Sequence, residues 1–121
     1  MAEKKSSIYK VAVASTDGEN VDQHYGRTDR FYVYRVDDDV GYDFVEMRKV
    51  QSVCMGGSHS VSKMMESVLG LSDCRYVVAS RIGDGASSCL RRHGIVAVES
   101  PGTVDDAILK VWKYNQIQNL F

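Results

Sequence analysis

The 121-residue chain has one proline, no surplus of charge of either sign and no long hydrophobic run. It contains no repeat or low-complexity segment, and its length fits one globular domain with its own core. The 15 basic and 16 acidic side chains leave a net charge of −1. Because nucleic-acid binders usually carry a basic surplus on one face, no nucleic-acid partner is expected. The longest uncharged stretch, between Gln51 and Lys63, is polar and rich in serine and glycine, so no membrane-spanning segment is predicted.

No signal peptide is predicted, and the short cysteine motifs of structural zinc sites are absent. Residues 1–7 have no apolar core and predict a disordered polar tail, which leaves residues 8–121 as a single domain. An odd number of widely spaced cysteines is not typical of a disulfide framework, and the expected location is the cytoplasm. No C-x-x-C pair or H-E-x-x-H helix occurs, so a soft-ligand site must combine residues that are far apart in sequence. The candidate donors are Cys54, Cys74, Cys89, His24, His59 and His93.

Hydrophobic patterning predicts a hairpin followed by alternating helices and strands. Apolar and β-branched residues predict strands at residues 9–15, 31–36, 42–50, 76–79 and 95–98. Helical spacing predicts a first helix whose apolar stripe is Val61, Met64, Met65, Val68 and Leu69. A second helix faces inward with Ala86, Cys89 and Leu90. A third helix is expected to have Thr103 as its N-terminal cap, with Asp106 three residues later in a variant of the capping box. Its apolar stripe is Val104, Ala107, Ile108, Val111 and Trp112.

This element order predicts an α/β protein with a ribonuclease H-like three-layer fold. Its five-stranded mixed sheet is expected in the order 3-2-1-4-5 with helices on its flanks. In open sheets, ligands bind beyond the carboxyl ends of the parallel strands, where the strand order reverses. Residues 16–26 follow the first strand and residues 81–85 follow the fourth. We therefore expect these two loops to lie side by side and to form the ligand site.

The loop after the first strand carries His24, between Gln23 and Tyr25 and just ahead of Gly26. The glycine lets the backbone turn and present the imidazole. His24 is either a ligand of a metal or cluster, an acid–base group, or a loop histidine bonded to a carboxylate such as Asp22. The composition of the loop alone favours the last of these.

The connection after the third strand places Cys54 and His59 on either side of Met55 and two glycines. A thiol, a thioether and an imidazole suit iron–sulfur, copper or zinc sites, and the glycines let the backbone wrap closely around a ligand. The same residues also fit a flexible connection in which Cys54 packs inward and His59 begins the next helix. The spacing of the two residues does not decide between these interpretations.

The loop after the fourth strand places Gly83, Asp84 and Gly85 at the start of a helix. Backbone N–H groups at a helix N-terminus can receive an anion, or Asp84 can cap the helix instead. Three arginines are expected near this rim and would attract an anionic ligand, although ordinary solvated charge explains each one singly: Arg27, Arg30 and Arg81.

The remaining donors have structural explanations. Cys74 stands just before a strand and Cys89 one turn into a helix, both at positions that are expected to face the core. His93 precedes Gly94 at a helix end, where a cation is favourable to the helix dipole.

Several short segments carry a family resemblance when they are taken together and in order. They are Lys10-Val-Ala-Val-Ala-Ser-Thr-Asp-Gly18, Val21-x-x-His24-Tyr-Gly26, Phe31-Tyr-Val-Tyr34, Gly83-Asp-Gly-Ala86, Leu90 with His93-Gly-Ile95, and Gly102-Thr-Val-Asp-Asp-Ala107. From Lys10 to about Trp112 the chain resembles the dinitrogenase iron–molybdenum cofactor biosynthesis family, whose members are accessory factors in nitrogenase assembly.

The resemblance implies the same fold, and binding of the iron–molybdenum cofactor or its iron–sulfur precursors by a carrier or chaperone rather than an enzyme. It also implies cluster-assembly proteins as partners. His24 matches the family histidine that is associated with cofactor binding, and Tyr25 stands where the family commonly has phenylalanine. Cys54 corresponds to a cysteine that occurs in some members.

The resulting hypothesis is a non-enzymatic binder of a metallocluster. The expected cluster-binding residues are His24, Cys54, Arg27, Gly83, Asp84 and Gly85, with His24, Cys54 and His59 as candidate metal ligands. One alternative is a divalent-metal-dependent nuclease or phosphoryl-transfer enzyme, in which Asp17 and Asp84 would meet with a third acid. The other alternative is a regulatory domain without a ligand. The oligomeric state is not predicted.

Overall fold

The computed structural model of the protein describes residues 8–50 and 61–118. Its main sheet has five strands in the order β4-β3-β1-β5-β6. They are β1 (Ile8–Ala14), β3 (Arg30–Asp37), β4 (Gly41–Lys49), β5 (Tyr76–Ala79) and β6 (Val96–Glu99). The β1–β3 and β3–β4 pairs are antiparallel, whereas β1–β5 and β5–β6 are parallel. The predicted strand order is confirmed, and every strand ends within one residue of its prediction.

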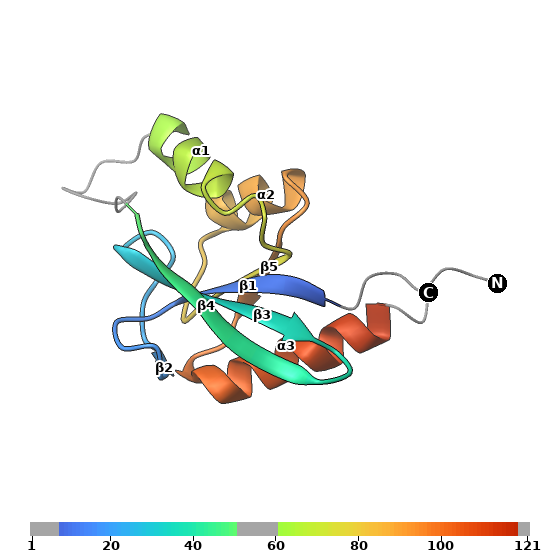
Figure 1. Cartoon of the computed structure of the whole chain (residues 1–121). Helices are drawn as coiled ribbons and strands as arrows, with labels where there is room; N and C mark the ends of the chain where they lie inside the picture. Colours follow the sequence, from blue (N-terminus) through green and yellow to red (C-terminus); the bar gives the residue numbers. More distant parts are fainter. Residues whose placement is uncertain (1–7, 51–60, 119–121) are drawn as a thin grey trace.

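Helices cover both faces of this sheet (Figure 1). α1 (Val61–Leu69) and α2 (Asp84–Arg92) lie on one face, and α3 (Val104–Gln118) lies on the other. β1 supplies buried side chains to both cores: Ala12 and Ala14 face α1 and α2, and Val11 and Val13 face α3. Small and β-branched residues on both sides of this strand therefore follow from its place between two helical layers.

The predicted inward faces are confirmed for two helices and only in part for the third. α2 buries Ala86, Cys89 and Leu90, and α3 buries its predicted stripe with Trp112 half-buried. On α1, Val68 is buried and Met64 half-buried, but Met65 and Leu69 are exposed. The helix turns Ser67 inward instead, because the Ser67 hydroxyl finds a buried partner in the Tyr25 hydroxyl at 2.7 Å. The spacing of apolar residues cannot predict that a polar residue such as serine is buried.

A small two-stranded sheet, which the sequence pattern did not predict, pins the loop after β1 to the start of α3. It consists of β2 (Asn20–Val21) and β7 (Gly102–Thr103). The Val104 N–H donates to the Glu19 carbonyl at 2.8 Å. The predicted cap is confirmed, since the Asp106 N–H donates to the Thr103 hydroxyl at 3.1 Å. Among residues 8–50 and 61–118, no helix is long and apolar enough to cross a membrane.

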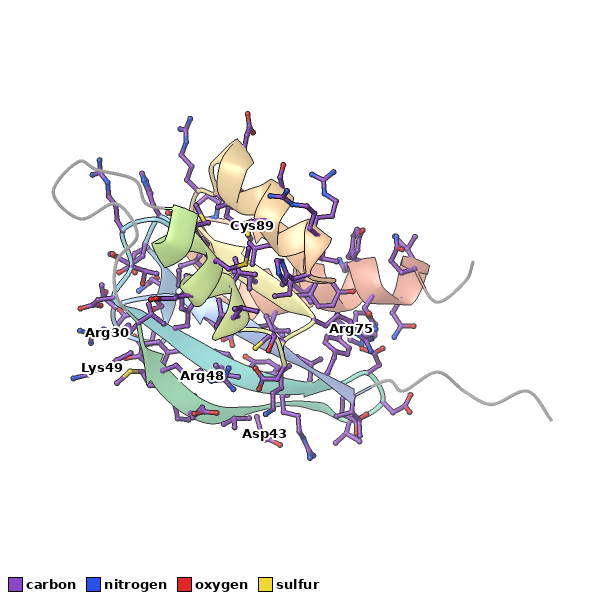
Figure 2. The ribbon with its side chains drawn as sticks, turned by 90° about the horizontal axis from the view of Figure 1, so that it is seen from above. Arg30, Asp43, Arg48, Lys49, Arg75 and Cys89 are labelled. Atoms are coloured by element: carbon purple, nitrogen blue, oxygen red, sulfur yellow. The ribbon has the colours of Figure 1, made fainter. Side chains whose placement is uncertain are left out.

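β4 forms one edge of the sheet, and most of its side chains are exposed, among them Asp43 and Lys49 (Figure 2). Arg48 is the one half-buried side chain of this strand. Its guanidinium donates to both carboxylate oxygens of Asp73, at 2.7 and 2.6 Å, and to the Gly70 carbonyl at 3.1 Å. These contacts tie the edge strand to the turn after α1, and they hold the pKa of the Asp73 carboxyl well below its usual range.

Candidate functional site

The loops that follow β1 and β5 lie side by side, as the topology predicted. His24 and Arg81 form an isolated parallel bridge. The Tyr25 N–H donates to the Arg81 carbonyl at 2.9 Å, and the Ser80 N–H donates to the Gln23 carbonyl at 3.0 Å. The two loops therefore extend the pairing of β1 and β5 beyond the carboxyl ends of the strands.

A cavity of about 300 Å³ opens where these loops meet the first turns of α1 and α2. We call it the His24 pocket. It is lined by His24, Gly26, Arg27, Met64, Arg81, Gly83, Gly85 and Ala86. Among the described residues, no aspartate or glutamate belongs to this lining, so the charged side chains that line the cavity here are cationic.

The backbone holds His24 at the head of a tight turn. The N–H groups of Arg27 and Thr28 both donate to the His24 carbonyl, at 3.1 and 3.0 Å. Thr28 is buried, and its hydroxyl donates to the Arg30 carbonyl at 2.6 Å, which fixes the end of the turn. The His24 side chain itself is exposed. The turn is thus held by hydrogen bonds of its backbone, while the imidazole stays accessible to a ligand.

Tyr25 anchors this turn to α1. Its side chain is 1% exposed, and its ring packs against Phe31 with the ring centres 5.8 Å apart. Its hydroxyl shares a buried hydrogen bond with Ser67, which stands one helical turn after Met64. Burial raises the pKa of the Tyr25 hydroxyl, so the group stays protonated and able to donate. This bond sets the spacing between the His24 turn and the helix that carries Met64.

The third part of the pocket is the start of α2. Gly83 is its N-cap residue in an extended conformation, and a Cβ on Gly83 or Gly85 would meet no atom within 4 Å. The Glu99 carboxylate accepts a hydrogen bond from the Ile82 N–H at 2.7 Å and so positions this loop. The interpretation of Asp84 as a helix cap is wrong: Asp84 is the first residue of the helix, and no side chain caps it. Asp84 is also not among the residues that line the pocket.

The arginines are divided between the pocket and the surface around it. Arg27 and Arg81 are exposed and line the cavity, and neither forms an ion pair within the described part of the chain. Arg30 was expected on the same rim but bonds Asp29 at 3.0 Å and does not line the cavity. Two unpaired guanidinium groups remain, and such groups attract and clamp anions.

Met64 is the pocket residue that the sequence did not reveal. Helical spacing assigned it to the core stripe of α1, and it is indeed half-buried against that core. It also lines the cavity together with His24. The one feature of the sequence that could have predicted this role is the place of Met64 in the first part of the helix, beside the carboxyl ends of β1 and β5. A thioether is a soft donor of the kind that suits iron–sulfur chemistry.

The other candidate donors fall into two groups. Cys54 and His59 lie outside the described residues. Cys74 and Cys89 are free and buried, as predicted, and Cys89 lies on α2 (Figure 2). Burial raises the pKa of the Cys74 thiol to about 12, which leaves it unreactive. His93 ends α2, where its Nδ1 bonds the Cys89 carbonyl at 2.8 Å, which confirms its structural role.

The carboxylates needed for two-metal catalysis are not brought together within the described residues. Among residues 8–50 and 61–118, no three histidine, cysteine, aspartate or glutamate side chains form a group that could hold a metal ion. Asp17 is engaged within its own loop, where its carboxylate accepts hydrogen bonds from the N–H groups of Glu19 and Asn20 at 2.8 and 2.9 Å. The nuclease alternative therefore gains no support from this part of the chain.

Residues 7–114 match the family described as dinitrogenase iron-molybdenum cofactor. The FeMo cofactor biosynthesis protein NifB of Chlorobaculum tepidum is 33% identical over 113 residues, which make up 91% of this chain and 25% of that protein. Protein NifX of Klebsiella pneumoniae is 34% identical over 92 residues, 76% of this chain and 56% of that protein. The chain thus spans about a quarter of this NifB and little more than half of NifX.

Solved structures share the fold at low sequence identity. The crystal structure of PH0822 superposes with a TM-score of 0.64 and 19% identity, covering 86% of this chain and 88% of that one. The apo form of the orange protein from Desulfovibrio gigas gives a TM-score of 0.58 at 18% identity, covering 87% and 88%. The family match extends over nearly all of the strands and helices described above. This chain belongs to the dinitrogenase iron-molybdenum cofactor family.

Proposed function

We propose that this protein binds and carries an anionic metallocluster in the His24 pocket. The cargo is the iron–molybdenum cofactor, a precursor of it, or a related iron–sulfur cluster. The lining of the pocket carries the proposal, since an imidazole, a thioether and two guanidinium groups line one cavity, and the described residues give these guanidinium groups no ion pair and the cavity no carboxylate. Family membership supports the class of cargo.

Each part of the lining has a distinct task in this proposal. His24 donates a nitrogen ligand and Met64 a soft sulfur contact. Arg27 and Arg81 balance the negative charge of the cluster. The backbone N–H groups at the start of α2, beside Gly83 and Gly85, offer further anion contacts. Asp84 acts through its backbone alone, because its carboxylate would repel an anion. Cys54 and His59 stay proposed ligands.

A carrier role suits the form of this site better than catalysis. The pocket is shallow enough to leave His24, Arg27 and Arg81 exposed. A cluster held by few protein ligands can pass to an acceptor by ligand exchange. The proposed partners are accordingly the cluster-assembly proteins that deliver and receive the cargo.

Anaerobic cluster loading tests the proposal. Purified protein is mixed with isolated iron–molybdenum cofactor, or with a synthetic [4Fe–4S] cluster in a parallel sample. Unbound cluster is removed by gel filtration, and retained iron and molybdenum are measured by elemental analysis and absorption. Wild type is expected to retain cluster, whereas His24→Ala and the charge reversal Arg27→Glu lose most of it.

Matched controls separate the pocket from general effects on the fold. His93→Gln alters a histidine that only ends α2, and Arg35→Glu reverses an exposed arginine of β3 outside the pocket. Both controls should retain cluster as wild type does. No retention by wild type, or equal retention by all four variants, would overturn the proposal.

A further inference from the structure

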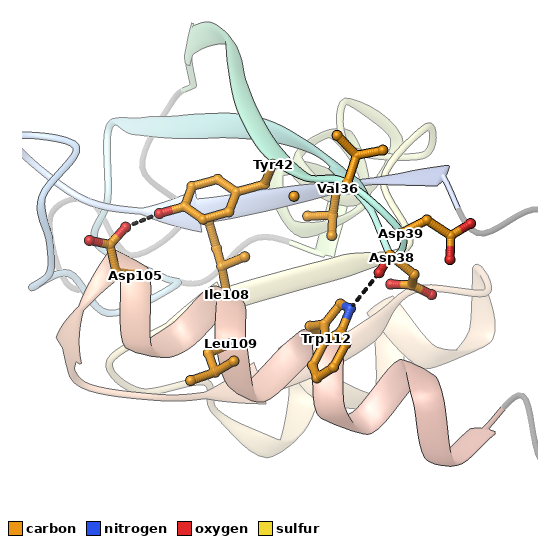
Figure 3. A pocket seen from close by; sticks show the side chains of 10 residues that line it. Val36, Asp38, Asp39, Tyr42, Asp105, Ile108, Leu109 and Trp112 are labelled. Carbon is orange, nitrogen blue, oxygen red and sulfur yellow. Dashed lines mark hydrogen bonds between the residues drawn. The ribbon is translucent and has the colours of Figure 1, made fainter.

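A second and larger cavity lies between α3 and the turn that joins β3 to β4 (Figure 3). Its volume is about 530 Å³. One wall is a single face of α3, since its residues follow one another at three- and four-residue spacing: Asp105, Ile108, Leu109 and Trp112. The other wall belongs to the hairpin and consists of Val36, Asp38, Asp39, Val40, Gly41 and Tyr42. We call this cavity the acidic groove.

Hydrogen bonds hold the two walls of the acidic groove in place. The Tyr42 hydroxyl donates to the Asp105 carboxylate, and the Trp112 Nε1–H donates to the Asp38 carbonyl at 3.1 Å (Figure 3). The Asp38 carboxylate accepts hydrogen bonds from the Tyr9 hydroxyl at 2.9 Å and from Asn115 Nδ2 at 2.8 Å. The groove is thus formed before any ligand arrives, which lowers the entropic cost of binding.

The lining of the groove combines negative charge with exposed apolar surface. Within the described part of the chain, the lining contains three aspartates and no lysine, arginine or histidine. Asp39 lies exposed on the rim, and its carboxylate points outward (Figure 3). Val40, Leu109 and Tyr42 are 86%, 49% and 39% exposed. This is the opposite charge character to the His24 pocket, whose charged lining is cationic.

The two cavities also occupy opposite ends of β1. Ile8, the first residue of β1, pairs with Asp37, which directly precedes the groove residue Asp38. The His24 pocket lies beyond the other end of the strand, on the α1 and α2 face. A molecule in the acidic groove therefore leaves the His24 pocket open.

We propose that the acidic groove docks a basic segment of a partner protein, in which lysine or arginine alternates with apolar side chains. Carboxylates attract the cationic groups, and the faces of Trp112 and Tyr42 suit a guanidinium or an apolar side chain. The hairpin wall runs directly into β4, which pairs only with β3 among the described strands. An extended peptide can therefore continue from the groove along this edge by main-chain hydrogen bonding, which a small organic cation cannot do. This proposal stands independently of the cargo of the His24 pocket.

A peptide titration of the full-length protein tests the proposal. The probe is acetyl-Arg-Leu-Lys-Leu-amide, and acetyl-Glu-Leu-Glu-Leu-amide and arginine amide serve as comparisons. Trp112 is the only tryptophan of the chain, so its emission reports directly on the groove. Backbone amide shifts in ¹⁵N-labelled protein locate the contact. The basic peptide is expected to change the Trp112 emission and to move the amide signals of residues 36–42 and 105–112.

Two variants and one control make the outcome decisive. Asp39→Asn on the exposed rim should weaken binding of the basic peptide about two- to fivefold, which is the range for one exposed charge pair. Leu109→Ala should weaken binding of this peptide as well. Glu66→Gln, which alters an exposed acid of α1 on the opposite face of the sheet, should change nothing. The proposal is refuted by no response at millimolar basic peptide, by an equal response to the acidic peptide, or by arginine amide binding as tightly as the peptide. The last result would assign the groove to small cations.

Discussion

Removing the hydroxyl of Tyr25 should destabilise the protein by about 1–3 kcal/mol, the usual cost of leaving a buried polar group without a partner. Tyr25 and Ser67 are 1% and 8% exposed, and their oxygens are 2.7 Å apart. In Tyr25→Phe the ring keeps its packing against Phe31, so the change isolates the hydroxyl. The Ser67 hydroxyl is then left buried with one hydrogen bond fewer.

The converse substitution completes a double-mutant cycle. Ser67→Ala should cost a similar amount, because the Tyr25 hydroxyl then loses its partner. Removing both groups leaves nothing unsatisfied, so the double variant should lose much less than the sum of the single losses. A coupling free energy of about 1–2 kcal/mol is expected between the two positions.

Urea unfolding measures these free energies. With a slope of about 1.5 kcal/mol per molar urea, a loss of about 1.5 kcal/mol lowers the midpoint by about 1 M. Single losses below about 0.5 kcal/mol, or strictly additive losses, would refute the reasoning. Cluster retention gives a second measurement. Because the bond links the turn of His24 to the helix of Met64, Tyr25→Phe should also weaken retention under conditions where the variant is fully folded.

Three further outcomes follow from the structure. Gly85→Ala should stabilise the protein by about 0.5 kcal/mol and so raise its unfolding midpoint slightly, because alanine favours the helix and its Cβ meets no atom within 4 Å. The same Cβ narrows the His24 pocket, so this variant should also retain less cluster. The pKa of Asp17 is lowered from 3.8 to about 2 by the N–H groups of Glu19 and Asn20. Its contribution to stability is therefore full above about pH 4 and is lost as the pH falls toward 2, so the stabilities of wild type and Asp17→Asn should converge over that interval in pH-dependent unfolding. Cys74, with its pKa raised to about 12 by burial, should react with iodoacetamide at neutral pH only after denaturation, and mass spectrometry of native and urea-treated protein checks this.

Much of the sheet could be predicted because the residue patterns that form its strands are local in the sequence. The strands are short runs of β-branched, aromatic and small residues, and their burial on both faces is visible in segments such as Val11 to Ala14. The parallel pairing of β1 with β5 follows from the right-handed crossover rule. This pairing predicts that residues 16–26 lie beside residues 81–85, and the bridge between His24 and Arg81 confirms it.

The candidate site was only partly predictable. His24, Arg27, Gly83 and Gly85 line the predicted pocket. Asp84, the first residue of α2, does not line it. Met64 was missed, since helical periodicity shows which face of a helix is apolar but not what lies opposite its first turn.

The sequence by itself determined the strands, their order and the meeting of two loops at the carboxyl ends of β1 and β5. The hydrophobic period and the strand propensity of each segment depend on neighbouring residues, and the handedness of the crossovers follows from the order of the segments along the chain. Only the tertiary structure decided which face of α1 turns inward and which charges gather around each cavity. Tyr25 and Ser67 stand 42 positions apart, and the bond between them exists only once the helix packs on the loop. In the same way, a near-neutral composition became a cationic pocket at one end of β1 and an acidic groove at the other, because folding separates charges that the sequence interleaves.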